Sequence, residues 1–169
     1  SFSTFIPNNL DKKISKKLVK FWVEKLRSHP ELHDKVEFDI AITTFSFDLY
    51  ERVKTLPKEL FSDLEKDKIK KSFLIHFCEL MMPVHTGALN IANTQMLSIN
   101  AEIEKYRIEG KPSINKLIKI CKKYGTMPFA KLARHAFIGT TLIKSLNTEG
   151  VLSSPRTSEY FSSIKTILS

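Results

Sequence analysis

The sequence contains little cysteine, glycine and proline, with two, five and seven residues of 169. Cys78 and Cys121 are too few for a disulfide framework, and no metal-ligand spacing surrounds them. Nucleotide-binding loops need closely spaced glycines so that backbone N–H groups can approach phosphate, and the glycines here are scattered. The low glycine and proline content also excludes collagen-like and disordered compositions.

Long apolar runs and secretion signals are missing as well. No run approaches the roughly 20 apolar residues that span a bilayer, no signal peptide opens the chain, and no Asn-x-Ser/Thr sequon occurs. With the cysteine count, these absences predict a cytoplasmic protein without a membrane partner. The first residue is Ser rather than Met, which we interpret as a piece excised from a longer multidomain protein.

Acidic residues are the third shortage. The chain has 27 Lys and Arg against 18 Asp and Glu, a net charge of +9. The segment from Gly110 to Thr148 holds eight Lys or Arg and no Asp or Glu. Such a segment attracts phosphates, nucleic acid or an acidic protein surface, and a solvated lysine face is the alternative.

The pattern of apolar residues predicts a mainly α fold. Spacings of three and four predict helices over residues 10–28, 47–55, 62–81, 88–109, 113–121, 126–143 and 154–164. Ser62 and Glu65 form a capping box at the start of the third. Apolar and polar residues alternate over 36–43, which predicts a strand with residues 1–6 as the other strand candidate. Such a two-stranded ribbon is weak alone, so either helices cover it or a missing part of the parent protein pairs with it.

We therefore expect a bundle of about six to seven helices with a small two-stranded β element, and an α+β fold as the alternative. One domain over residues 1–169 is expected, with sub-lobes at 1–56 and 57–169.

The stretch "KYGTMPFAKLARHAF" (123–137) is the first candidate site. Gly125 is expected to end one helix and Thr126 to cap the next, which would leave free N–H groups at a positive helix end. Lys131 and Arg134 lie three residues apart on one face, and His135 lies one turn beyond Lys131. These groups would bind an anion, unless the helix is buried with its cations at the edge.

The second candidate site lies in "HDKVEFDI", with His33, Asp34, Glu37 and Asp39. On a strand, Glu37 and Asp39 would share one face about 7 Å apart, as acid–base or metal-binding pairs do. The solvent face of a half-buried strand is the alternative. No residue is predicted to be catalytic or to bind a metal.

Three stretches resemble phosphoenolpyruvate synthase-like proteins, relatives of pyruvate, phosphate dikinase. Residues 1–49, with "FIP" and "LHDKVEFDI", resemble the part that follows the family's ATP-binding region. "YGTMPFAKLARHAFIGTTLIKSL" is similar to the family's YGT-x-PFA-x-LAR-x-AFIA segment, and "GVLSSPRTSEYFSSIKTILS" to the segment after it. Lys131 stands where the family usually has a small residue.

The resemblance implies a parent phosphotransferase (kinase) with an ATP-grasp domain before this piece and a mobile phosphohistidine domain after it. ATP and Mg²⁺ are expected for the parent, and no cofactor for this chain, which lacks the ATP-grasp segment and the Gly/Ser/Thr-rich phosphohistidine motif. No catalytic residue of the family carries over. The implied role is a non-catalytic central domain that positions the acceptor or the phosphohistidine domain.

The expected partners are accordingly the two neighbouring domains and a phosphate-bearing small molecule. The alternative is a basic helical module that binds nucleic acid or an acidic partner. Nucleic acid is less favoured because most aromatic residues fall at core spacing.

Overall fold

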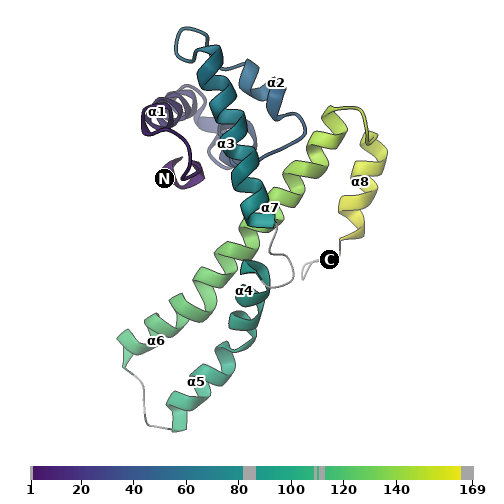
Figure 1. Ribbon diagram of the computed structural model, residues 1–169. Helices are drawn as coiled ribbons and strands as arrows, with labels where there is room; N and C mark the ends of the chain where they lie inside the picture. Colours follow the sequence, from purple (N-terminus) through teal and green to yellow (C-terminus); the bar gives the residue numbers. More distant parts are fainter. Residues whose placement is uncertain (1, 82–86, 109, 111–112, 165–169) are drawn as a thin grey trace. The chain divides into compact units, whose positions relative to one another are not determined.

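The computed structural model describes residues 2–81, 87–108, 110 and 113–164. Within these ranges the chain is mainly helical, with eight α-helices (Figure 1). The mainly α prediction is therefore confirmed. The chain divides into two compact units: unit 1 is Ser1–Cys78 with Ile138–Ser169, and unit 2 is Glu79–Phe137. The division expected at residue 57 falls inside unit 1.

Unit 1 is built mainly from helices of the first half of the chain. Its elements are η1 (Phe2–Phe5), α1 (Lys12–Ser28), η2 (Pro30–Leu32), η3 (Val36–Ile40), α2 (Leu49–Lys54), most of α3 (Asp63–Met81), the second half of α7 (Met127–Thr148) and α8 (Ser154–Ser163). The elements of unit 2 are α4 (Ala88–Leu97), α5 (Ile99–Ile108), α6 (Ile114–Ile120), η4 (Cys121–Thr126) and the first half of α7.

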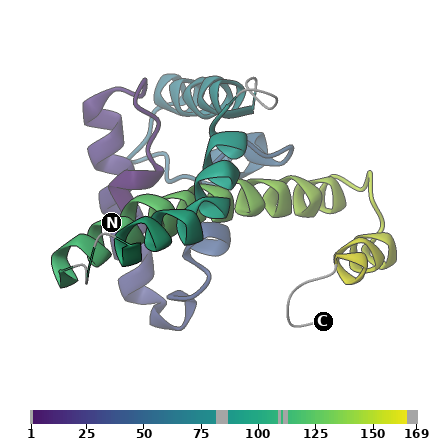
Figure 2. The same ribbon diagram turned by 90° about the horizontal axis from the view of Figure 1, so that it is seen from below.

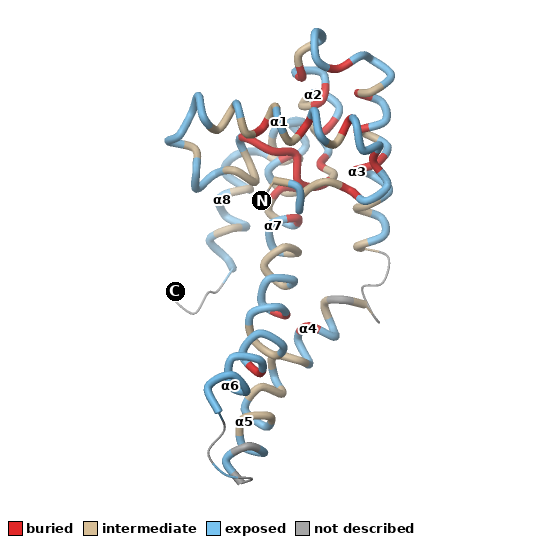
Figure 3. The backbone as a smooth tube through the Cα atoms, turned by 90° about the vertical axis from the view of Figure 1, so that its left-hand side faces the viewer, coloured by how far each residue is buried: buried red, intermediate tan, exposed pale blue. Residues whose placement is uncertain are grey.

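The core of unit 1 forms around the apolar face of α1. Ile14, Leu18 and Trp22 follow each other at four-residue spacing, so one stripe of the helix is buried. Ile69 and Phe73 of α3 belong to the same buried cluster. Figure 3 shows the buried residues of this unit concentrated in α1, α2, α3 and the segments between them.

The predicted two-stranded β element is wrong, and so is the α+β alternative, because the described residues contain no strand. Phe2–Phe5 is a short 3-10 helix, and Val36–Ile40 is a π-helical turn closed by the Ala41 N–H on the Val36 carbonyl at 2.9 Å. Only after this turn does the backbone extend, and Ile40, Ala41 and Ile42 are all buried. The alternating pattern marked a buried segment without a strand partner.

Cationic side chains satisfy the carbonyls that a neighbouring strand would otherwise have bonded. Arg52 donates to the carbonyls of Phe38 and Ala41 at 3.2 and 3.1 Å, and Lys25 donates to Asp39 O at 2.6 Å. Buried Lys66 similarly donates to Leu56 O at 2.6 Å and to Lys54 O at 3.0 Å after α2. Hydrogen bonds from these cations therefore fix the irregular segments of unit 1, without a sheet.

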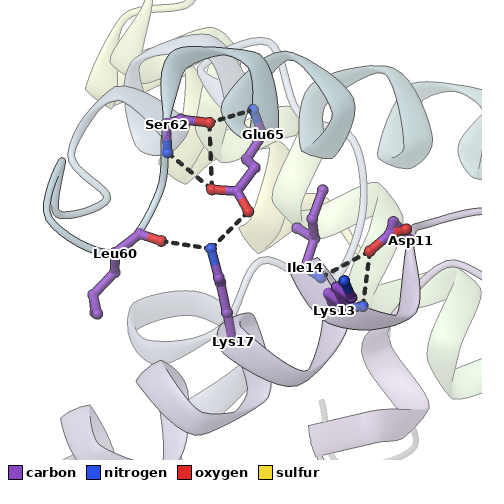
Figure 4. Close-up of polar contacts among 7 residues, drawn as sticks. All are labelled: Asp11, Lys13, Ile14, Lys17, Leu60, Ser62 and Glu65. Carbon is purple, nitrogen blue, oxygen red and sulfur yellow. Dashed lines mark hydrogen bonds and ion pairs between the residues drawn. The ribbon is translucent and has the colours of Figure 1, made fainter.

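The predicted capping box at Ser62 is confirmed (Figure 4). Ser62 N–H donates to the Glu65 carboxylate at 2.9 Å, and Glu65 N–H donates to Ser62 Oγ at 3.3 Å. Lys17 of α1 pairs with Glu65 at 2.7 Å and also donates to Leu60 O at 3.2 Å. Asp11 caps α1 by accepting N–H groups from its first turn. Local caps thus also connect α1 to α3.

Replacing Ser62 by Ala should lower the free energy of unfolding by about 1 kcal/mol, because the N–H of Glu65 loses its partner. Urea denaturation followed by circular dichroism measures this change. Ser158→Ala, at an exposed position inside α8, is the matched control and should change stability by less than about 0.5 kcal/mol. Equal stability of the Ser62→Ala variant and the wild type would contradict the capping role.

The same carboxylate should make stability depend on pH. The Lys17 ammonium, followed by the Ser62 N–H, lowers the pKa of Glu65 below its ordinary value of 4.5. The folded state therefore gains stability from Glu65 above pH 4.5, and this gain disappears as the pH falls through the lowered folded pKa. Wild type should exceed Glu65→Gln in stability at pH 7, and the gap should shrink by pH 3. A constant gap would contradict this.

Candidate functional site

Thr126 does not begin a helix, so this part of the first candidate site is wrong. It lies at the end of the π-helical turn η4, which follows α6 directly and continues into α7. Met127, the first residue of α7, donates its N–H to Lys122 O, five residues back. The free N–H groups and the positive helix end expected beside Lys131 are therefore absent at this position.

Pro128 accounts for the difference between prediction and structure. Proline has no N–H, and inside a helix its ring collides with the preceding turn. Here the π-helical turn lies immediately before Pro128, and such turns accommodate local departures from regular helix geometry. Gly125 has no positive φ, unlike Gly110 and Gly150, so it is an ordinary helical residue. The helix continues where the sequence pattern predicted an end.

Lys131, Arg134 and His135 lie in the first half of α7, within unit 2. Lys131 is exposed, whereas Arg134 and His135 are half-buried. Nδ1 of His135 lies 2.7 Å from the Lys131 carbonyl, which accepts a hydrogen bond from it. This ring nitrogen is therefore directed at its own helix. Anion binding by these three side chains stays a prediction, now without the helix end.

The residues of the second candidate site do not form the expected pair. Glu37 and Asp39 lie in the turn η3, so the shared strand face and its spacing do not exist. His33 and Asp34 are exposed, and Nδ1 of His33 lies 3.3 Å from Pro30 O. Asp39 borders a hollow together with residues of α2 and α7.

That hollow, of about 150 Å³, is called the polar hollow, and Arg52 and Lys144 also line it. Burial lowers the pKa of Arg52, and the carboxylates of Asp48 and Asp39 act in the opposite direction. Nζ of Lys144 lies 4.2 Å from the centre of the Phe38 ring. Ser145 Oγ accepts the Phe47 N–H at 3.0 Å nearby. These contacts join the second half of α7 to residues 38–52, which is a structural role.

A larger hollow of about 520 Å³ lies within unit 2. Lys116, Lys119 and Lys123 line it from α6 and η4, at spacings of three and four that place them along one side of the helix. We call it the lysine hollow. Asn115 and Tyr124 add polar groups to its lining. Three lysines thus border a space large enough for a small anionic molecule.

Glu102 of α5 contributes a carboxylate to the lysine hollow. Lys105 donates to it at 2.7 Å, and this contact is the main reason why the pKa of Glu102 is lowered. Lys123 and a hydrogen bond with Tyr124 lower it further. The lining therefore keeps an excess of positive charge. The segment 110–148, which has no Asp or Glu, indicated this site in the sequence. The prediction, however, centred on Lys131, Arg134 and His135.

No three His, Cys, Asp or Glu side chains gather into a possible metal site within the part of the chain that is described. Nor does any described helix combine the length and apolar character needed to cross a membrane. Comparisons with protein-family models, curated proteins and solved structures find no match. The resemblance to phosphoenolpyruvate synthase-like proteins therefore remains a hypothesis based on the three sequence stretches.

Alanine should have opposite effects on stability at Gly125, which lies inside the continuous helix, and at Gly150, where φ is positive. At Gly125, an added Cβ would lie 3.5 Å from Ile99 Cδ1, an ordinary contact, so Gly125→Ala should raise stability by about 0.5–1 kcal/mol. At Gly150, where φ is +72°, Ala should lower stability by about 1 kcal/mol. Thermal and urea unfolding measure both. Destabilisation by Gly125→Ala would indicate a helix end at that residue.

Proposed function

We propose that this chain is a non-catalytic helical module of an ATP-dependent phosphotransferase of the phosphoenolpyruvate synthase type. In this proposal it positions a phosphate-bearing acceptor or the mobile phosphohistidine domain. The observation that supports it best is the lysine hollow, where Lys116, Lys119 and Lys123 face a space of about 520 Å³.

The chemistry of phosphoryl transfer makes such a module useful. Catalysis of this reaction depends mostly on positioning and on electrostatic stabilisation of the phosphoryl oxygens. Ammonium groups form charge-assisted hydrogen bonds to phosphate oxygens, and lysine binds phosphate as a compact point charge. Three lysines on one side of a helix could hold a phosphorylated group while other domains carry the reacting groups.

Several carboxyl groups in the described part of the chain have a lowered pKa: Asp11, Glu31, Glu65, Asp67 and Glu102. Hydrogen bonds from neighbouring donors stabilise their charged forms. In this proposal ATP and Mg²⁺ belong to the ATP-grasp domain of the parent.

Unit 2 also exposes large apolar side chains. Leu97 is 77% exposed, Ile114 76% and Phe129 61%. Large apolar side chains exposed in the same unit as a cationic hollow are typical of a domain that meets another protein or domain. This observation supports the expected partners, the neighbouring domains of the same polypeptide.

The alternative is a basic module that binds nucleic acid or an acidic partner. Phe47 and Tyr50 are exposed in unit 1, as rings that stack on bases would be. However, the ammonium groups of Lys54 and Lys70 lie 4.7 and 3.8 Å from the centre of the Tyr50 ring. Because these ammonium groups already contact the ring, a stacking base would compete with them, and an acidic partner is favoured over a stacked single strand.

Pyrophosphate should bind the lysine hollow. Isothermal titration of the chain with pyrophosphate should show binding, and Lys119→Ala should weaken it by about tenfold, because one charge-assisted contact is worth about 1.5 kcal/mol. Lys58→Ala, an exposed lysine in unit 1, is the control and should leave the affinity unchanged. Equal effects of the two substitutions would contradict a site in the lysine hollow.

A second measurement addresses catalysis. With ATP and Mg²⁺ the chain alone should release no phosphate above background. Steady turnover that persists in the Lys119→Ala variant would show a reaction centre elsewhere in these residues and would overturn the non-catalytic assignment.

A further inference from the structure

A groove of about 460 Å³ lies in unit 1 between the N-terminal residues and α1. The two segments lie side by side in Figures 1 and 2, and η1 packs against α1. We call it the N-terminal groove. It belongs to neither candidate site and shares no residue with the lysine hollow.

One edge of the N-terminal groove is a row of cations. Lys12, Lys16 and Lys20 line it at four-residue spacing, so they follow one another about 6 Å apart along α1. All three are exposed, and the lining contains no carboxylate. Lys17 of the same helix, by contrast, pairs with Glu65.

Among the described residues, these three lysines take part in no ion pair. Their charges are therefore not used to hold the fold together. Three like charges in a lining without a carboxylate also repel one another, so a partner that supplies carboxylates would gain from all three at once.

Apolar residues also line the groove, beside the polar Ser3, Asn8 and Ser15. Ile6, Leu10 and Val19 line it together with Pro7, which is fully buried. A partner must therefore bring apolar groups to these residues and negative charges to one edge. An amphipathic helix with carboxylates every four residues has this arrangement, because its charged and apolar stripes run side by side at the spacing of the lysines.

We propose that the N-terminal groove binds an acidic amphipathic helix of a partner protein. The complementary charge would fix orientation and register, and the apolar contacts would supply most of the affinity. A single-stranded nucleic acid fits less well because no aromatic ring lines the groove. Phe2 and Phe5 pack against the core instead, and the ring centres of Phe2 and Trp22 lie 6.1 Å apart.

The test is fluorescence anisotropy of the whole chain with a labelled synthetic helix that carries Glu at every fourth position and Leu beside it. Binding should weaken as salt rises from about 50 to 500 mM, because charges at an exposed edge are screened. Lys16→Glu should weaken binding about tenfold, because it removes one attraction and adds one repulsion. Lys13→Glu is the matched control: it makes the same charge change one residue beyond Lys12, away from the groove lining, and should change affinity less than about twofold.

Two further arms complete the test. A peptide with Gln in place of Glu should lose most of the affinity, and circular dichroism should show that both variants are folded. Equal weakening by Lys13→Glu and Lys16→Glu would overturn the proposal, as would binding that salt does not affect. An oligonucleotide that binds more tightly than the peptide and depends on Lys16 would assign the groove to nucleic acid. This test is independent of the pyrophosphate test, because Lys119 lines the lysine hollow and does not line the N-terminal groove.

Discussion

Donation from long cationic side chains to backbone carbonyls is the interaction on which the structure of unit 1 depends. Lys25 and Arg52 bond the carbonyls of residues 38–41, and Lys66 bonds those that follow α2. Without Arg52 and Lys66, buried or part-buried carbonyls would lack these partners, because no strand lies beside them in the described part of the chain. An excess of lysine thus serves the fold of a helical protein whose connections are irregular.

This use of charge separates the cations into two groups. Lys17, Lys25 and Lys66 contact groups of the protein itself, and their positions are fixed by those contacts. The lysines of the lysine hollow and of the N-terminal groove line open spaces of about 520 and 460 Å³, although Nζ of Lys123 also lies 4.8 Å from the centre of the Tyr124 ring. Net charge alone does not distinguish the groups, since a lysine that donates to a carbonyl keeps its charge. The partner chemistry proposed for unit 1 and unit 2 follows from the second group.

The two π-helical turns show how local exceptions shape these surfaces. The turn η4 continues α6, so Lys123 lies on the same helix as Lys116 and Lys119, and this helix runs on into α7 just before Pro128. If the helix had ended at Gly125, the next helix would have offered its first N–H groups to an anion, whereas the continuous helix offers side chains. The turn η3 leads the chain from the exposed Asp39 into the buried segment that begins at Ile40. In both places the N–H bonds the carbonyl five residues back instead of four, and this local change decides which groups the surface offers.

The sequence by itself determined where most of the helical segments lie, the buried stripe Ile14–Leu18–Trp22, and the Ser62–Glu65 cap, because each depends on residues within one or two turns. It also located the acid-free segment that contains the lysine hollow. Only the tertiary structure decided that 36–40 is a turn, since that choice depends on Lys25 and Arg52, which lie at least eleven residues from the carbonyls they bond. The N-terminal groove exists only because η1 packs against α1, a contact that no local pattern encodes.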